Sequence, residues 1–429
     1  MKRYFKFGLK YGLLSGLIGV MLMGPAHSAE LARCDGVEGY ATQGARTFLW
    51  RPEWLAIAKT QITTSPEQAK ALKSAADKAL GRGPYSVTDK PRAPTGGSPH
   101  DYASIGPYWW PDPAKPDGLP YVRRDGEVNP ERATASFDMT RSQALRDDVQ
   151  TLSLAYSLLG DEAYARHAAN LLRVWFLDPK TRMNPNLTFA QAVPGQSDGR
   201  GEGIIDALRF QPIVESIGLI APSGALTADE LRGLEQWFGA LANWMRDSDN
   251  CRDARARSNN HGIYYDMMLA HFSLFARQEP QAKTVLSAFA ETRLKAQMAA
   301  DGSFPQEMSR TRSWHYSVWA LDGALSAAQL AQCVDVDLWR ASADGRNLKT
   351  GVDYLTPYLT GARTWPKADL DLNDPKRKAR EQVAAKRTLR RAAWGFGDAQ
   401  LSQAIENRTL PSNLEDDLLL PAFPVTTQK

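Results

Sequence analysis

The chain has few cysteines and few histidines for its 429 residues. Its three cysteines, Cys34, Cys251 and Cys333, stand in no Cys-x-x-Cys or Cys/His metal spacing, and the histidines form no His-Glu-x-x-His pattern. The usual zinc sites are therefore not indicated, and we expect no cofactor and no catalytic metal. Three cysteines cannot all pair within one chain, so we expect one disulfide or none, together with a buried thiol.

The sequence also has little net charge. The formal charge is +4, and it falls to near zero without the basic residues of the N-terminus, which are Lys2, Arg3, Lys6 and Lys10. A chain so close to neutrality gives no general case for a nucleic-acid partner and leaves room only for a local basic site. Nothing in the sequence bears on the oligomeric state.

Beyond its first residues the chain has no apolar run long enough to cross a membrane. The basic N-terminal residues precede an apolar stretch over 11–23, and small residues follow at 26–29, which is the pattern of a secretory signal peptide. We therefore predict a signal peptide over residues 1–29 and a single catalytic domain over residues 30–429, periplasmic or secreted, with no membrane contact after cleavage.

What the chain does have is a long series of helical signals. In "TSPEQAKALKSAADKALGRG", Ser65 stands at the N-cap, Pro66 at the first helical position and Gln68 in the capping-box position. Thr227 and Glu230 repeat the capping box. Further helices are expected over residues 140–159, 161–176, 204–219, 227–247, 260–277, 279–299, 314–332, 345–360 and 376–394. With no series of alternating strands and no fixed-period repeat, this pattern predicts an all-α fold, an α/α toroid in which antiparallel helix pairs form an incomplete barrel with long loops over its cleft.

Two long segments, 82–139 and 178–203, do not fit the helical pattern. Prolines and glycines interrupt both, and long ordered loops are usually functional. The first holds aromatic and arginine side chains that suit an acidic polysaccharide, because sugar rings stack on aromatic faces and carboxylates accept from guanidinium groups. These residues are Tyr108, Trp109, Trp110, Arg123 and Arg124. The alternative is that the two tryptophans only close a core beneath the loop.

The second segment offers Gln191 and Arg200 as further hydrogen-bond donors to hydroxyls or carboxylates. Its asparagines, Asn184 and Asn186, could act in the same way or simply form turns. The sequence "GRGEG" lacks the spacing of a phosphate-binding loop, so nucleotide binding is not indicated.

Two predicted helices begin with polar side chains. Asn260 and His261 open one of them in "RARSNNHGIYYDMM". The other, in "MSRTRSWHYSVWAL", begins with Arg310, Arg312, His315 and Tyr316. A helix N-terminus favours an anion, so the two starts could face one cleft. Plain capping by Ser258 or Asn259, with His261 as a satisfied polar residue, is the alternative.

Five blocks of the sequence together resemble the alginate-lyase superfamily of polysaccharide lyases. They are "PYWWPDP", "GLPYVRRDGEVNPE", "MNPNLTFAQAVPGQSDGRGEGIID", "SNNHGIYYD" and "DGSFPQEMSRTRSWHYS", and the resemblance extends from about residue 85 to about residue 365. It implies an α/α toroid that cleaves a β-1,4-linked uronate polymer, polymannuronate (alginate) or glucuronan, by β-elimination.

The resemblance also implies roles for particular residues. The Asn-His pair of the superfamily falls on Asn260 and His261, its arginine on Arg310 and its catalytic tyrosine on Tyr316. Some members have one more residue between the arginine and the tyrosine than this chain has, so Arg312 is a rival for the role of Arg310. We also expect Arg312 and His315 among the substrate-binding residues.

In the expected reaction, Asn260, His261 and Arg310 neutralise the carboxylate on C5, while Tyr316 removes the C5 proton and protonates O4 in a syn elimination. Nearby cations are expected to lower the pKa of Tyr316, and His261 is the rival base. Two other functions stay open: a glycoside hydrolase that uses carboxylates, and a binding protein without turnover. The hydrolase candidates are Asp112, Asp125, Glu127 and Asp198.

Overall fold

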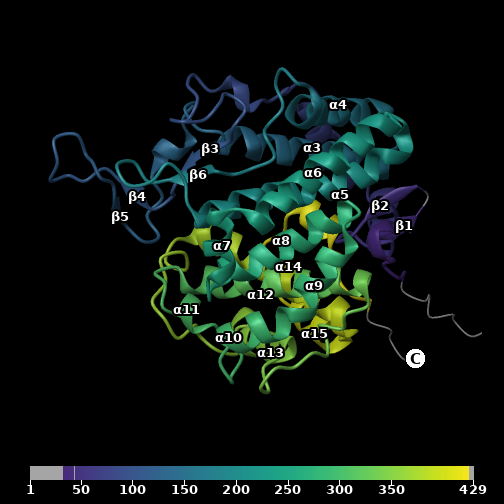
Figure 1. Cartoon of the computed structure of the whole chain (residues 1–429). Coiled ribbons are helices and arrows are strands. Elements are labelled where there is room, and N and C mark those ends of the chain that lie inside the picture. The colour runs from purple at the N-terminus through teal and green to yellow at the C-terminus, as the bar shows by residue number, and fades with distance from the viewer. Residues whose placement is uncertain (1–31, 43, 425–429) are drawn as a thin grey trace, which may run out of the picture. The chain divides into compact units, whose positions relative to one another are not determined.

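The predicted series of helices forms a ring of helix pairs, shown in the computed structural model of Figure 1. The structure describes residues 32–42 and 44–424, so the predicted signal peptide lies outside the described residues. The α-helices are α1 Pro52–Thr64, α2 Pro66–Leu80, α3 Met139–Leu159, α4 Glu162–Leu172, α5 Gln211–Ile220, α6 Ala228–Asp247, α7 Asp249–Ala256, α8 Asn260–Phe275, α9 Glu279–Phe289, α10 Lys295–Gln297, α11 Pro305–Met308, α12 Ser313–Ala331, α13 Leu348–Leu359, α14 Pro375–Phe396, α15 Ala399–Glu406 and α16 Leu414–Leu419. The strands are β1 Tyr40–Thr42, β2 Ala45–Thr47, β3 Ala103–Ile105, β4 Trp109–Trp110, β5 Val122–Arg123 and β6 Phe189–Ala192.

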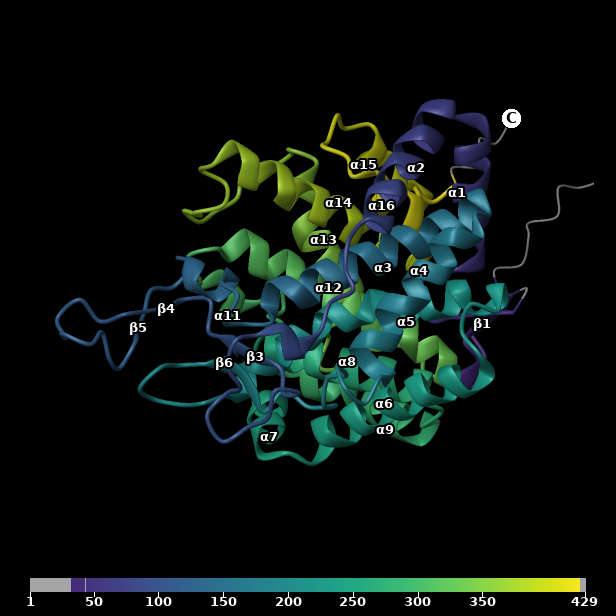
Figure 2. The same cartoon turned by 90° about the horizontal axis from the view of Figure 1, so that it is seen from above.

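The inner layer of the ring consists of helices that are buried on nearly all sides. Almost every residue of α5, α8 and α12 is buried, as expected of helices that are apolar around their whole circumference. Contacts pass in order from α3 to α5, α8, α12 and α14, while α4, α9 and α13 pack against this layer. Both views place α8 and α12 in the middle of the helical body (Figures 1 and 2). The all-α toroid predicted from the sequence is therefore confirmed.

The ring is completed by elements from both ends of the described chain. Helix α1 contacts α16 and α3, and Trp54 of α1 packs edge-on against Trp394 of α14, with their ring centroids 5.8 Å apart. None of the helices within residues 32–42 and 44–424 combines the length and apolarity needed to span a membrane.

The capping signals identified several helix starts correctly. The Ser65 hydroxyl accepts a hydrogen bond from the backbone of Gln68, and Thr227 and Glu230 form the predicted reciprocal box. The segment predicted as a helix over 204–219 differs, because it begins as a 3-10 helix, η5 (Gly201–Phe210), before α5. Its start packs closely on β6, because a Cβ on Gly203 would lie 2.4 Å from the carbonyl oxygen of Ala190. Helix α1, which has no side-chain cap, was not predicted.

The two long non-helical segments pair with each other. Strand β3 of the first lies parallel to β6 of the second, with Ala103 opposite Phe189. Strands β4 and β5 form an antiparallel pair within the first segment, with Trp109 opposite Arg123. Figures 1 and 2 show the β4–β5 loop extending from one side of the ring.

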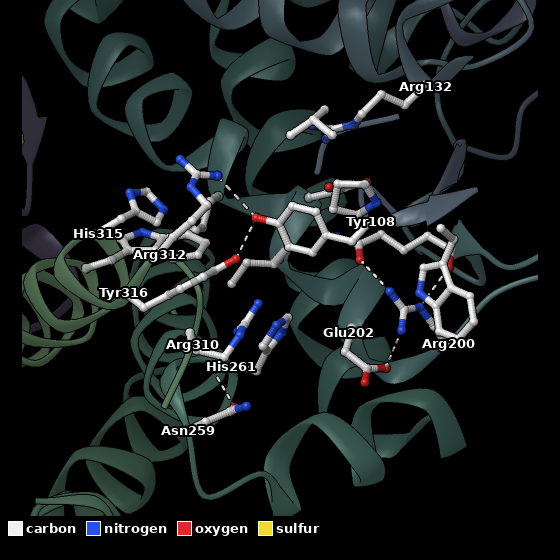
Figure 3. Close-up of a pocket in the computed structure, with 18 of the residues that line it drawn as sticks. Tyr108, Arg132, Arg200, Glu202, Asn259, His261, Arg310, Arg312, His315 and Tyr316 are labelled. Carbon is white, nitrogen blue, oxygen red and sulfur yellow. Dashed lines mark hydrogen bonds and ion pairs between the residues drawn. The ribbon is translucent and has the colours of Figure 1, made fainter. Parts of the chain in front are cut away.

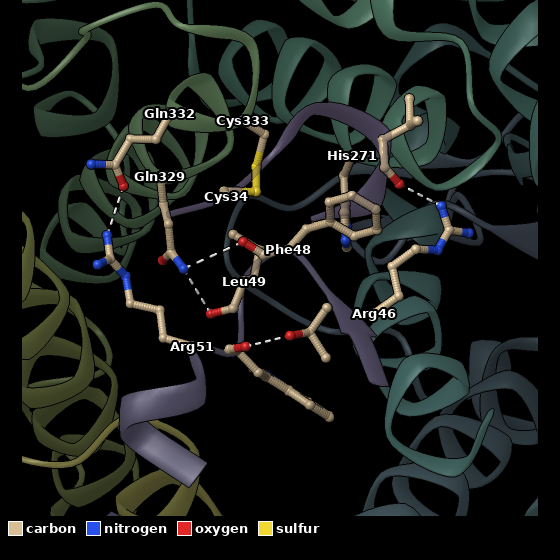
Figure 4. The surroundings of a disulfide bond; sticks show 12 residues. Cys34, Arg46, Phe48, Leu49, Arg51, His271, Gln329, Gln332 and Cys333 are labelled. Carbon is tan, nitrogen blue, oxygen red and sulfur yellow. Dashed lines mark hydrogen bonds between the residues drawn. A yellow bond between two sulfur atoms is a disulfide. The ribbon is translucent and has the colours of Figure 1, made fainter. Parts of the chain in front are cut away.

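The N-terminal segment is fixed to the ring by a buried carboxylate and a disulfide. Glu215 of α5 accepts hydrogen bonds from the backbone of Phe48 and Trp50, at 3.0 and 3.1 Å, and it lies 2.7 Å from Nε2 of His271 in α8. Cys34 and Cys333 form a disulfide, shown in Figure 4. Cys251 is free and buried, so of the two alternatives predicted, one bridge or none with a buried thiol, the structure has the first.

Candidate active site

A cavity of about 800 Å³ lies between the starts of α8 and α12 and the paired loop segments. Two carboxylates, Glu202 and Asp206, line it together with eight arginines, which are Arg123, Arg132, Arg146, Arg200, Arg209, Arg257, Arg310 and Arg312. Such an excess of cations in a concave site attracts a polyanion. The formal charge of the whole chain concealed this basic site.

Glu307 holds the two polar helix starts together. Its buried carboxylate accepts hydrogen bonds from the backbone nitrogen of Asn260 at 2.6 Å and from the Asn260 side-chain amide at 2.8 Å. The Glu307 carbonyl accepts from the backbone nitrogen of Arg310 at 3.1 Å. Because His261 follows Asn260 and Arg310 follows Glu307 by one turn, these contacts place His261 and Arg310 side by side, as Figure 3 shows.

A pair of tyrosines lies at the centre of the cavity. The hydroxyl oxygens of Tyr108 and Tyr316 are 2.6 Å apart, and Nη1 of Arg312 donates to the Tyr108 oxygen at 3.2 Å. The guanidinium carbon of Arg310 lies 3.9 Å from the centre of the Tyr316 ring. Tyr108, predicted as a stacking surface for sugar, thus brings its hydroxyl to the proposed catalytic tyrosine.

The pKa of Tyr316 differs from the sequence-based expectation. Burial raises the pKa well above its ordinary value, and the neighbouring Tyr108 raises it further. Arg310 and Arg312 lower it, but by less than burial raises it. The expectation of a lowered pKa was therefore wrong for the unliganded site, because it counted the cations and left out the cost of burying a phenolate.

The two rival arginines are held by different carboxylates. Arg310 binds Asp125 through Nη2 at 2.7 Å and through Nε at 3.2 Å, and within the described chain its Nη1 makes no hydrogen bond. Arg312 binds Asp371 through Nε and directs Nη1 at Tyr108. Figure 3 shows Arg310 on the His261 side of the tyrosine pair and Arg312 on the His315 side. Arg310 is thus better placed for a substrate carboxylate.

His261 is a neutral imidazole at ordinary pH. Burial lowers its pKa to about 4; Glu202 opposes this shift, and the cations Arg200, Arg310 and Arg257 add to it. Its Nδ1 atom is buried and has no hydrogen-bond partner among the described residues, so no carboxylate orients it as a strong base would require. This environment suits a hydrogen-bonding role better than proton abstraction.

The second long segment supplies one wall of the cavity. Arg200 donates through Nε to the Gln191 carbonyl at 2.9 Å and through Nη2 to its side-chain oxygen at 3.1 Å. Gln191 has a positive φ of 51°, which is costly for a residue with a side chain and is commonest at functional sites. The Arg200 guanidinium also lies over the ring of Trp109, at 5.6 Å. Gln191, Arg200 and Trp109 line the cavity as predicted.

Asn260 does not lie in the cavity, where the sequence predicted it. Its side chain is fully buried, its amide nitrogen donates to Glu307, and it is not among the residues that line the cavity. Asn259 lines the cavity instead, while its side-chain oxygen caps α8 by accepting from the backbone of His261 at 3.1 Å. Glu307 and Asn259 thereby satisfy the N–H groups that were expected to attract a substrate anion.

Trp110 and Arg124 were also misplaced by the sequence analysis. The Arg124 guanidinium lies 5.2 Å from the centre of the Trp110 ring, and the indole nitrogen donates to the Glu127 carbonyl at 2.9 Å. Neither side chain lines the cavity. In a two-residue strand, adjacent side chains point to opposite faces, so Trp109 and Trp110 could not both face the substrate.

His315 lines the cavity and contacts Glu381, with Nδ1 3.0 Å from the carboxylate. Together with Asp371, these two residues place potential metal-ligand atoms within 4.8 Å of one another. Arg312 already pairs with Asp371 and lies 3.9 Å from Glu381. A guanidinium group therefore supplies the positive charge at this cluster.

The carboxylates proposed for a hydrolase, Asp112, Asp125, Glu127 and Asp198, do not line the cavity, so the structure gives no support for that role. Burial would raise the pKa of Asp125, but its hydrogen bonds from Arg310 and Thr311 hold it well below its usual range. A group so acidic cannot serve as the general acid that a hydrolase needs.

Several lining residues were missed by the sequence analysis: Arg132, Gln143, Arg146, Glu202, Arg209, Arg257 and Trp319. Arg132 and Glu202 stand in the two long loop segments, where nothing local distinguishes them from their neighbours, and the others stand in segments that read as ordinary amphipathic helix or turn. The helical spacing of Gln143 and Arg146, three residues apart and so on one face, was the one local signal available.

The comparisons with known proteins identify the class of this protein as a polysaccharide lyase, and its ring of helix pairs agrees with that class. More narrowly, the chain belongs to the alginate lyase family, because the family model described as "Alginate lyase" matches residues 86–365. A comparison with curated protein sequences finds no significant match.

One solved structure supports this assignment, and two more distant ones share the fold. An alginate lyase from Bacteroides ovatus is 36% identical, with a TM-score of 0.82, and the match covers 88% of this chain and 99% of that one. The alginate lyase A1-III from Sphingomonas species A1 is 16% identical, with a TM-score of 0.51, over 85% of this chain and 94% of that one. A variant of A1-III complexed with a tetrasaccharide gives 16% identity and a TM-score of 0.52 over 85% and 93%.

The environment of His261 predicts its titration. Because its pKa is lowered to about 4, we expect its imidazole signals in an NMR titration to stay constant from pH 8 to about pH 5, with the His261→Gln variant assigning them. The folded pKa lies below the unfolded value of about 6.5, so this group's contribution to stability is lost as pH falls from there toward 4. A midpoint near 6.5 would contradict the described environment.

Proposed function

We propose that the protein cleaves β-1,4-linked uronate polymers, polymannuronate (alginate) or glucuronan, by syn β-elimination and leaves unsaturated uronate ends. The observation that carries the proposal is the Tyr316 hydroxyl, which lies in an arginine-lined cavity beside Arg310 and a neutral His261. The alginate lyase named in the 36% identical structure supports the substrate class. Mannuronate and glucuronate differ only at C2, so the proposed substrates include polymers of both.

The first requirement of the reaction is to neutralise the carboxylate on C5. Removing the adjacent proton places a second negative charge on that group, and preorganised donors in a site shielded from water stabilise it most effectively. Arg310 offers its free Nη1, and His261 and Asn259 line the same side of the cavity. We assign the amide donor to Asn259 and a positioning role to Asn260, whose buried amide donates to Glu307.

The second requirement is a base and an acid on one face of the sugar ring. In the proposed step, the Tyr316 phenolate takes the C5 proton, a double bond forms between C4 and C5, the bond from C4 to O4 breaks, and the same proton passes from Tyr316 to O4. The Tyr108 oxygen already accepts from Arg312, so its own hydrogen is free to be donated to the Tyr316 phenolate. The tyrosine pair thereby connects Arg312 to the reacting oxygen.

Tyr316 is a better candidate for the base than His261. An imidazole with a pKa of about 4 is too weak to remove a proton next to a carboxylate. The Tyr316 phenolate is a strong base, although its raised pKa makes it a minor species in the unliganded protein at neutral pH. A catalytic rate that increases with pH follows from this assignment.

We also propose that the enzyme is exported. The pattern of residues 1–29 supports this localisation, and the Cys34–Cys333 disulfide is typical of proteins that mature in an oxidising compartment. An external location suits a polymeric substrate that the cytoplasm does not contain.

The activity is tested by incubating the protein with polymannuronate, glucuronan and a neutral glucan while following the ultraviolet absorbance of the unsaturated uronate. We expect an increase with at least one uronate polymer and none with the glucan. The Tyr316→Phe variant should lower kcat by about a thousandfold or more and leave uronate affinity nearly unchanged, because the ring and both arginines remain.

Tyr358→Phe, which removes a half-buried hydroxyl from α13 away from the cavity, is the matched control and should retain the wild-type rate. Release of saturated reducing ends without absorbance would show that the enzyme is a hydrolase. A Tyr316→Phe variant with a near-normal rate would remove this tyrosine from the mechanism.

The two arginines should differ in their effect on the pH profile. Removing the Arg312 charge takes away a group that lowers the pKa of Tyr316, so in Arg312→Gln the increase of kcat/KM with pH should shift to higher pH, by about one unit. Arg310→Gln should shift the profile in the same direction, because Arg310 also lowers the pKa of Tyr316, and should in addition lower the high-pH plateau of kcat/KM by about a hundredfold, since it removes the neutralising donor.

The exposed Arg232, which pairs with Asp229 on α6, provides the control, and Arg232→Gln should have the wild-type profile. Equal midpoints for Arg312→Gln and the wild type would contradict the proposed link between Arg312 and the tyrosine pair.

A further inference from the structure

One part of the cavity is not used by the proposed chemistry. Arg132 comes from the short 3-10 helix η3 (Pro130–Ala133), Arg146 from α3 and Arg209 from η5, and all three line the cavity. Figure 3 places Arg132 across Tyr108 from Arg310 and His261. Arg132 therefore lies away from the residues assigned to the reacting carboxylate (Figure 3), and Arg146 and Arg209 come from elements that contribute nothing to that group.

Arg132 and Arg209 lie near the same buried carboxylate. Nη1 of Arg209 is 3.2 Å from Oδ1 of Asp206, and Asp206 also accepts from the Ser104 hydroxyl at 2.6 Å and the Tyr102 hydroxyl at 3.1 Å. Burial would raise the pKa of Asp206, but Arg209 and Arg132 outweigh it and hold the pKa below its ordinary value. One ionised carboxylate thus lies near two arginines and balances only one of their two positive charges.

Arg146 adds a third positive charge with little compensation. Its ion-pair partner is the adjacent Asp147, at 2.7 Å, and Gln143 holds this carboxylate with hydrogen bonds of 3.0 Å. Burial lowers the pKa of Arg146 most; Asp147 and, more weakly, Glu415 raise it, while the nearby cations Arg209 and Arg387 lower it further. The cluster therefore favours an added anion.

The hydrogen bonding of the three guanidinium groups is also incomplete. The Nε atoms of Arg132, Arg146 and Arg209 are all buried and have no hydrogen-bond partner within the described part of the chain. Buried polar groups are normally satisfied, and each unmet donor costs free energy. These Nε atoms are closed to a ligand as well as to water, so a carboxylate in the cavity would meet the other parts of the three guanidinium groups that line it, whose charge and planar shape suit a carboxylate.

We propose that Arg132, Arg146 and Arg209 form a second carboxylate-binding subsite that holds another uronate residue of the same polysaccharide chain. This inference rests on the proposed function, because it requires a substrate with repeated carboxylates. Its consequence is selectivity for length: a uronate oligomer long enough to reach the subsite binds more tightly than a shorter one, whereas a neutral sugar at that place gains nothing.

The subsite is tested by binding rather than by turnover. Oligomannuronates and oligoglucuronates of increasing length are titrated calorimetrically into the Tyr316→Phe protein with and without Arg146→Gln. We expect equal affinity for the shortest oligomers that bind, and a loss of about tenfold or more for longer ones, as for removal of a charge-assisted contact. Arg146→Lys should recover part of the loss, because it keeps the charge without the fork.

Arg246→Gln is the matched control, because Arg246 pairs with its neighbour Asp247 as Arg146 pairs with Asp147 but does not line this cavity. It should leave every affinity unchanged. Loss of affinity at all oligomer lengths in Arg146→Gln, or at none, would overturn the subsite.

Failure of the subsite and failure of the lyase reaction can be distinguished. If the wild type turns over substrate and Arg146→Gln loses affinity at every oligomer length or at none, the subsite is overturned and the proposed reaction is not. Length-dependent loss of binding without any wild-type turnover supports the subsite and overturns the proposed reaction, while absence of both binding and turnover overturns both.

Discussion

The buried carboxylate of Glu307 is the contact on which the arrangement of the site depends. It accepts two hydrogen bonds from Asn260 at the start of α8, and its own backbone accepts from Arg310 just before α12. These two helices are neighbours in the inner layer of the ring, but helix packing alone would allow them to slide. The Glu307 contact fixes their starts relative to each other, so that His261 and Arg310 face the tyrosine pair together.

Carboxylates also hold several of the arginines of the cavity in place. Asp125 holds Arg310, Asp371 holds Arg312, and Asp206 holds Arg209, so each cation is positioned before a substrate arrives. Such preorganisation avoids the cost of reorienting side chains during the reaction. Asp125 belongs to the loop after β5, so the loops that extend from the ring also take part in fixing the reaction centre.

The sequence predicted most of the fold because its signals are local. Capping residues such as Ser65 and Thr227 mark helix starts by themselves, and prolines and glycines mark the two loop segments. The sequence did not predict the roles of residues that depend on partners distant in the chain. Asn259 and Asn260 are adjacent in sequence, and only the position of Glu307 decides which one is buried. Arg132, Arg146 and Arg209 converge from three separate elements, and the burial of Tyr316, which raises its pKa, could not be inferred from neighbouring charges.

The central claim is that one face of the cavity neutralises the C5 carboxylate while Tyr316 reaches the C5 proton from the tyrosine pair. The most direct measurement is a crystal structure of the Tyr316→Phe variant with a bound oligomannuronate or oligoglucuronate. The account predicts that the carboxylate of the uronate to be cleaved contacts Arg310, His261 and Asn259, and that its C5 and O4 both face position 316. A bound chain whose C5 faces His261, with its carboxylate directed away from Arg310, would contradict it.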